Sequence, residues 1–372
     1  MKKAIVLISF IIIVVVSTAS FAEATDYYDF NELNSELSES LFDSMDENTI
    51  KFFENLGINN LDFEKLYKVS FKSLITYFTP ELKDRIKDIF SAFFELFSVV
   101  LMLSLFNALT DGSSINKSLM LFGSAVVILM GFANISDVIN SCLSALKLSS
   151  TFMISYIPVF TLIISFSGNP AGALVYNSFV LGFAEFISVI ISSGLVEFIG
   201  CFLCLAISFS FNEVLNTNRL IGVTNKTVNL ILGISGSLFS SMLTIKNVLA
   251  VSLDSVSLRG IRLILSSFIP VIGSSISEAY SSILGSINLI KGSVAVIGIL
   301  AVVIINLPVI IEALLYYISF SALSYISEIT GCNRVSDLFK AICCAVRILL
   351  LFVVFEMFLL IISTGIILAF RS

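Results

Sequence analysis

Residues 293–320, SVAVIGILAVVIINLPVIIEALLYYISF, form a long apolar run in which Glu312 is the single charged residue. A helix crosses the hydrocarbon core of a bilayer, about 30 Å thick, with about 20 mostly apolar residues. This run therefore predicts a membrane-spanning helix. Similar runs occur elsewhere in the chain, and we expect further spans at residues 89–109, 117–138, 149–167, 172–192, 195–212 and 346–370. The sequence thus predicts an all-α, polytopic helical membrane protein with about seven spans.

The composition excludes several classes of protein. Of the 372 residues, 57% are hydrophobic and only 13% are charged, and the mean hydropathy is +1.02. One water-soluble core cannot hide that much apolar surface. The chain has no histidine, which excludes imidazole bases and histidine-ligated metals. Its net charge of -6 is opposite to the charge that nucleic-acid binding needs. We therefore expect no enzyme activity, no cofactor and no metal site.

Residues 1–24 have the pattern of a secretory signal peptide. Two lysines at the start precede an apolar stretch from Ala4 to Val16, which is short for a spanning helix. Small residues follow, so cleavage after Ala22 and cleavage after residue 24 both fit the pattern. The alternative is an uncleaved anchor helix. In both cases we expect the segment that follows to lie outside the cytoplasm.

Residues 25–88 are predicted to form an acidic extracytoplasmic helical segment. Residues 23–88 hold 15 Asp and Glu against 7 Lys and Arg, whereas residues 89–372 hold 12 of each sign. Apolar residues recur at helical spacing in the acidic segment, which predicts two or three amphipathic helices with a break at residues 57–60. The alternative is a loosely ordered tether. We assign residues 89–372 to a multi-span membrane domain.

Residues 213–292 differ from the rest of this domain because polar and small residues interrupt their apolar runs. Pro270 and Gly273 would break a helix, and broken backbone at membrane depth needs protein or a water-filled cavity around it. Such helices mark the working site of many transporters. The region is therefore either re-entrant and cavity-lining, or an amphipathic region at the membrane interface. Its candidate functional polar surface comprises Asp254, Arg259, Arg262, Pro270, Gly273, Glu278 and Lys291.

Four acidic residues fall inside predicted spans: Glu95, Glu185, Glu312 and Glu356. A charged acid at the centre of a bilayer costs about 2.5–3.5 kcal/mol unless it finds water, a proton or a partner. These acids are either a proton path or structural pairs with Arg259, Arg262, Lys291 or Arg347. Glu185 and Glu356 lie deepest and are the candidate intramembrane acids. We interpret the Cys201-x-x-Cys204 spacing as apolar filling, since the chain offers no histidine partner.

Several motifs together resemble one protein family. Ile157-Pro158 precedes Ser167-Gly168-Asn169, and three longer motifs follow: DSVSLR at 254–259, FIPVIGSSISEA at 268–279 and KGSVAVIG at 291–298. With the exported leader and the acidic segment before them, they resemble the stage III sporulation protein AE family of endospore-forming bacteria. The resemblance covers nearly the whole chain and is most specific over residues 254–298.

The resemblance implies a non-enzymatic role in a multi-protein complex. The family belongs to a set of eight proteins of the stage III sporulation A operon, made in the mother cell. They join stage II sporulation protein Q of the forespore in a channel or secretion-like complex across the two membranes, which late forespore development requires. A separate cytoplasmic ATPase of the set would explain why this chain has no Walker loop. The alternative is a stand-alone permease for a small solute.

Overall fold

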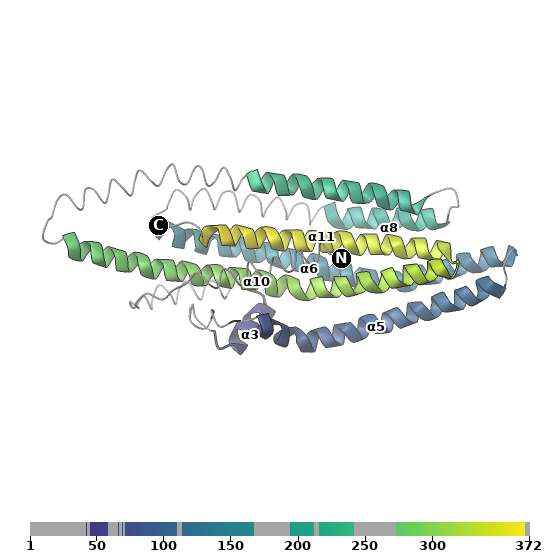
Figure 1. Cartoon of the computed structure of the whole chain (residues 1–372), viewed down its shortest axis with the longest axis horizontal. Helices are drawn as coiled ribbons and strands as arrows, with labels where there is room; N and C mark the ends of the chain where they lie inside the picture. The colour runs from purple at the N-terminus through teal and green to yellow at the C-terminus, as the bar shows by residue number, and fades with distance from the viewer. Residues whose placement is uncertain are drawn as a thin grey trace.

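The computed structural model describes residues 45–58, 71–109, 114–166, 194–211, 216–241 and 273–368, together with Phe42, Leu66 and Val69. These residues are almost entirely α-helical and include no strand, which confirms the predicted all-α class. The labelled helices in Figure 1 are α3 (Glu47–Asn55), α5 (Phe71–Leu109), α6 (Ser114–Phe166), α8 (Val196–Phe211), α10 (Gly273–Ile329) and α11 (Asn333–Leu368). A further helix covers residues 217–241.

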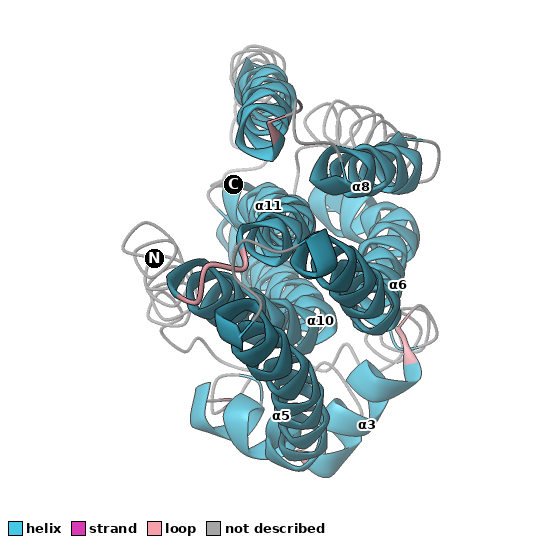
Figure 2. Ribbon diagram, turned by 90° about the vertical axis from the view of Figure 1, so that its right-hand side faces the viewer, coloured by secondary structure: helices cyan, strands magenta, loops and turns pink. Residues whose placement is uncertain are grey.

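The long helices lie side by side along one axis (Figure 1), and α10 and α11 form an antiparallel hairpin in their midst. Viewed along the bundle, α5 and α6 pack against this hairpin, and α8 packs on the side of α11 (Figure 2). The hairpin turns at Gly331, whose φ of 76° is costly for any residue with a Cβ. Stacking of Phe320 on Phe339, with ring centroids 6.2 Å apart, sets the register between the two helices.

Among the described residues, four helical segments are long and apolar enough to cross a membrane, so the chain is a membrane protein. They are Thr76–Leu109, Met120–Val159, Ile290–Ile329 and Asn333–Thr364, and Glu197–Ser210 of α8 is a shorter apolar helix. The predicted number of seven spans is not confirmed. The spans expected at 117–138 and 149–167 belong to the one helix α6, because no glycine or proline interrupts residues 139–148. The span expected at 172–192 lies outside the described residues.

The bundle is much longer than a bilayer is thick. At 1.5 Å per residue, α6 with 53 residues and α10 with 57 residues extend about 80 Å and 86 Å. Large apolar side chains are exposed on its flanks, including Leu109 (81%), Leu129 (75%) and Phe122 (72%). Such side chains belong against lipid or against another membrane protein rather than against water.

The acidic segment is partly described, and α3 is the first complete helix in its described part. Asp46 caps this helix, its carboxylate accepting hydrogen bonds from the backbone N–H groups of Asn48 and Thr49. The helix ends at Asn55 and is followed by Gly57 with a φ of 67°, which confirms the break predicted at residues 57–60. Its buried face carries Phe52 and Phe53.

Helix α5 crosses the boundary that the sequence suggested at residue 88. It runs without a break from Phe71 to Leu109, so the last helix of the acidic segment continues into the membrane domain. Near its start, the hydroxyl of Tyr77 donates a hydrogen bond of 3.1 Å to the backbone oxygen of Asn48, which attaches α3 to it. The predicted signal peptide, residues 1–24, lies outside the described residues.

The described part of the region 213–292 is helical except for Asn216. Residues 217–241 form one helix, and residues 273–292 form the first part of α10. Gly273 therefore begins a helix instead of interrupting one. Residues 213–215 and 242–272 lie outside the described part of the chain, so the break expected at Pro270 stays a prediction.

Candidate functional site: polar groups inside the apolar bundle

The structure describes only part of the predicted polar surface. Gly273 and Glu278 lie on the first turns of α10, and Lys291 lies farther along the same helix with 4% of its surface exposed. The remaining members, Asp254, Arg259, Arg262 and Pro270, lie outside the described residues, as does Glu185. That these residues form one surface stays a prediction.

Two hydrogen bonds join α6 to α10 deep in the bundle. The hydroxyl of Tyr156 donates to the backbone oxygen of Val294 at 3.0 Å, and the amide nitrogen of Asn306 donates to the hydroxyl of Ser149 at 2.7 Å. Both Tyr156 and Asn306 are fully buried. Burying a polar group without a hydrogen bond costs about 1–3 kcal/mol, so these bonds fix how the two helices align.

Tyr156 also explains a glycine in the KGSVAVIG motif. A Cβ placed on Gly298 would lie 2.5 Å from the ring of Tyr156, closer than any van der Waals contact. The ring has no exposed surface and its hydroxyl is held by Val294. The absence of a side chain at Gly298 therefore leaves a recess on α10, and the ring of Tyr156 on α6 packs into it.

Glu312 is paired, but with a residue that the sequence did not suggest. Its carboxylate forms an ion pair with the guanidinium of Arg85 on α5, with side chains 9% and 37% exposed. Tyr316 lies one turn after Glu312 on α10, and Asp88 and Asp137 are close enough to interact with it electrostatically. Among the described residues, the partner of Glu312 is therefore Arg85 and neither Lys291 nor Arg347, while Arg259 and Arg262 lie outside them. Arg85 was missed because it lies in the acidic segment, and only the continuity of α5 places it against α10.

Arg347 is a polar residue of α11 that contacts the helix of residues 217–241. Its guanidinium donates a hydrogen bond to the side-chain oxygen of Asn225, on the helix of residues 217–241. Its Nε atom is buried and has no hydrogen-bond partner within the described part of the chain. Asn225 also accepts a weak hydrogen bond from the thiol of Cys344, at 3.4 Å. One amide oxygen thus attaches the outer helix to α11.

Replacing Asn225 with alanine is expected to lower the free energy of unfolding by about 1–3 kcal/mol, because it leaves the half-buried guanidinium without its acceptor. Asn229→Ala on the same helix is the matched control, since Asn229 is exposed. Thermal unfolding of both variants in detergent micelles measures the difference. Equal stability of the two variants would show that Asn225 does not hold Arg347.

Glu356 is a buried acid with an unpartnered carboxylate oxygen. It lies on α11 with 3% of its surface exposed, and its Oε2 atom has no hydrogen-bond partner among the described residues. The same holds for Oδ1 of Asn306 and Oγ of Ser150. Glu95, by contrast, is exposed on α5. Glu356 therefore fits the predicted class of intramembrane acid, whereas Glu312 is a structural pair.

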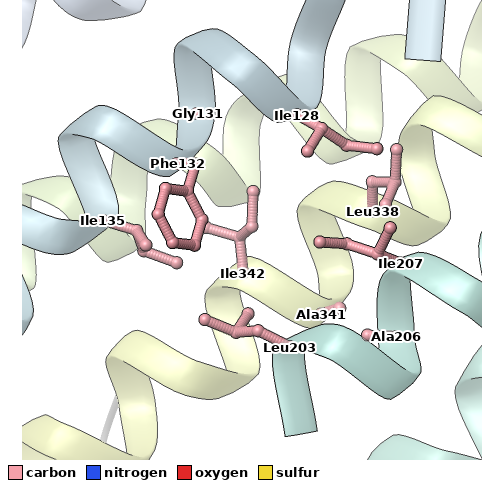
Figure 3. Close-up of a pocket in the computed structure, with 10 residues that line it drawn as sticks. All are labelled: Ile128, Gly131, Phe132, Ile135, Leu203, Ala206, Ile207, Leu338, Ala341 and Ile342. Carbon is pink, nitrogen blue, oxygen red and sulfur yellow. The ribbon is translucent and has the colours of Figure 1, made fainter. Parts of the chain in front are cut away.

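A small cavity lies where α6, α8 and α11 meet (Figure 3). Its volume is about 20 Å³, and its lining includes Phe132, Leu203, Leu338 and Ile342. One water molecule would fit by volume, but the lining offers no polar side chain to hold it, so the cavity stays dry. It is a packing gap and no solute site. Cys201 and Cys204 lie close by on α8 and are exposed, so they do not fill the core.

Among the described residues, the titratable groups outside the membrane-spanning segments show no catalytic pattern. Burial raises the pKa of the Cys332 thiol, which keeps it protonated and unreactive. On α3, the hydrogen bond from Lys51 to Glu47, 2.5 Å long, lowers the pKa of Glu47 and raises that of Lys51. Within the described residues, no three His, Cys, Asp or Glu side chains gather to hold a metal ion.

Comparison with known proteins places the chain among sporulation proteins. It is 22% identical over 204 residues to stage III sporulation protein AE of Bacillus subtilis (strain 168), covering 55% of this chain and 51% of that protein. The match thus spans about half the length of the relative. No solved structure matches the chain. The family model for stage III sporulation protein AE matches residues 49–370, from α3 to the end of α11. The chain belongs to the stage III sporulation protein AE family.

Proposed function

We propose that this protein is a membrane component of a channel or secretion-like complex that links mother cell and forespore during sporulation. The observation that carries the proposal is the family match over residues 49–370, which includes every long helix of the bundle. In this proposal the protein lies in the mother-cell membrane around the forespore and acts without enzyme activity. Its acidic N-terminal segment faces the space between the two membranes.

The shape of the bundle supports a role in an assembly. Helices of about 80 Å reach well beyond a hydrocarbon core of about 30 Å, so part of the bundle is available to partners outside the membrane. Exposed apolar side chains on α5 and α6, such as Phe94 (58%) and Phe122 (72%), suit lipid or a neighbouring membrane subunit. The partners we propose are the other membrane proteins of the stage III sporulation A operon and its cytoplasmic ATPase. Stage II sporulation protein Q would be contacted indirectly.

The stand-alone permease remains the alternative, and the described residues give it little support. The cavity between α6, α8 and α11 holds about 20 Å³, too little for a solute. Reconstitution of the purified chain in liposomes separates the two functions. Solute flux through this protein alone would favour the permease, whereas flux only with partner proteins would favour the complex.

Affinity purification of the tagged protein from sporulating cells tests the proposal directly. We expect other stage III sporulation A proteins to be recovered with it. Variants Arg259→Ala and Glu278→Ala should lose these partners and abolish spore formation, while the protein stays at its normal level in the membrane. The charge-conserving Arg259→Lys separates a docking role from a structural one, because structural pairing predicts degradation of the alanine variant and rescue by lysine. Recovery of the protein without any member of the set would contradict the proposal.

A further inference from the structure

Besides Nε of Arg347, three buried polar atoms without hydrogen-bond partners lie on α6, α10 and α11 in the described part of the chain. They are Oγ of Ser150, Oδ1 of Asn306 and Oε2 of Glu356. The three side chains are 5%, 0% and 3% exposed. Each comes from a different helix, and all three helices pack against one another. Buried polar atoms almost always have a partner, so three orphans in one core require an explanation.

The register of the helices puts the three residues at one height along the bundle. Asn306 is bonded to Ser149, which precedes Ser150 in α6. On the hairpin, Ser324 bonds to Ser336 and the thiol of Cys343 donates to the backbone oxygen of Tyr317. Continuing this antiparallel register along α11 brings Glu356 opposite residues 303–305, within one turn of Asn306.

The helical repeat also directs two of the three side chains toward each other. Phe132 of α6 and Leu338 of α11 line the same cavity (Figure 3). Ser150 and Glu356 each follow these residues by 18 positions, which is five full turns of an α-helix. They therefore lie on the same faces of α6 and α11 as the cavity residues, farther along the groove between the two helices. Burial of both side chains agrees with this placement.

The three groups have the chemistry of a site that binds a positively charged ligand. A carboxylate oxygen and an amide oxygen are acceptors, so they cannot satisfy each other without a proton or a cation between them. The hydroxyl of Ser150 offers one further oxygen. Oxygen ligands suit hard cations, and a single carboxylate balances a single positive charge. A divalent ion would leave an uncompensated charge in the core.

We propose that Glu356, Asn306 and Ser150 form a binding site for one monovalent cation, a sodium ion or a proton. The site is independent of the proposed complex, because it rests on three buried side chains of this chain alone. Its ligand neutralises Glu356 and ties α6, α10 and α11 together at one point. Occupancy of the site therefore strengthens the packing of the three helices.

Charged groups on the helices packed around the site are exposed, paired or distant along their helix, and Lys291 of α10, which is buried, lies more than three turns from residues 303–305. On α6, Lys147 is exposed, and on α10, Glu312 is paired with Arg85. On α11, Arg347 lies more than two turns away and is bonded to Asn225. Glu197, at the start of α8, is exposed. Among the described residues, none of these groups forms an ion pair with Glu356, so in this proposal the cation comes from solution.

Thermal unfolding of the purified full-length protein in detergent tests the proposal. The melting temperature is measured against increasing sodium chloride, with choline chloride keeping the ionic strength constant, for the wild type and for Glu356→Gln. A sodium site predicts a saturating rise for the wild type and no rise for the variant, because a ligand that binds only the folded state stabilises it. Glu197→Gln, an exposed acid, is the matched control and should behave as the wild type.

A proton site predicts a different pattern in the same assay. Without sodium, the wild type should gain stability relative to Glu356→Gln as the pH falls from about 8 to about 6, because the folded chain keeps a proton that the unfolded chain releases. Asn306→Leu, which removes a proposed ligand, should weaken whichever response is found. If the wild type and Glu356→Gln respond identically to both sodium and pH, the site does not exist. A response that Glu197→Gln abolishes as well would also overturn it.

Discussion

Replacing Arg85 with methionine is expected to lower the free energy of unfolding by about 3 kcal/mol. The change leaves the carboxylate of Glu312, 9% exposed, without the cation that neutralises it. Breaking a buried pair from one side costs about 3–5 kcal/mol, and the lower end applies because the side chain of Arg85 is 37% exposed and water reaches it. Chemical unfolding in detergent micelles measures the loss.

A double variant separates the ion pair from simple packing. Arg85→Met with Glu312→Leu removes both charges, and we expect it to recover most of the lost stability, because apolar replacements of buried pairs are often neutral. Lys51→Met provides the exposed counterpart, since the Lys51–Glu47 pair lies in solvent, and should cause no measurable change. If the double variant is as unstable as Arg85→Met alone, the loss comes from the stem of the arginine and not from its charge.

Gly298→Ala is expected to cost about 1–3 kcal/mol, the range for overpacking a tight core. The new methyl group would lie 2.5 Å from the ring of Tyr156, which is fully buried and bonded to Val294. Either the ring or the α6–α10 contact must move. We expect a lower melting temperature and a lower level of protein in the membrane.

Gly233→Ala is the matched control for this prediction. Gly233 also lies inside a helix, but a Cβ there meets nothing within 4 Å. Alanine should stabilise that helix by about 0.5–1 kcal/mol, the usual gain over glycine in a helix interior. The two substitutions are chemically identical and should have opposite signs. A similar gain at both positions would mean that Tyr156 does not occupy the recess at Gly298.

Local signals predicted much of the fold. The apolar run at 293–320 lies within α10, and the turn residues at 57–60 follow the end of α3, because both depend on neighbours in sequence. Helix boundaries were less predictable. The polar stretch in the middle of α6 separates two spans by composition, yet Ser149 and Ser150 are buried against other helices there, and the backbone stays helical. Hydropathy describes the residues of one segment and carries no information about the other helices that the segment contacts.

The candidate site was also predictable where it depends on local sequence and not where it depends on contacts between helices. Glu356 was identifiable because an acid within an apolar run is costly wherever that run lies. Its proposed partners were not, since Asn306 and Ser150 are distant in sequence and only the register of three helices places them at the same height. The same reason hid Arg85 as the partner of Glu312. The KGSVAVIG motif was visible in the sequence, but the reason for its Gly298, the ring of Tyr156, required the packed helices.

The unbroken course of α5 has a mechanical meaning. The helix is held at its start by the hydrogen bond between Tyr77 and Asn48, in its first half by Arg85 and Glu312, and near its end by Asn107 and the backbone oxygen of Thr330. A continuous helix transmits displacement along its axis instead of absorbing it. A protein that pulled or turned α3 would therefore also displace α5. The far end of α5 contacts the α10–α11 turn. Force applied at one end of the bundle would arrive, through α5, at the other.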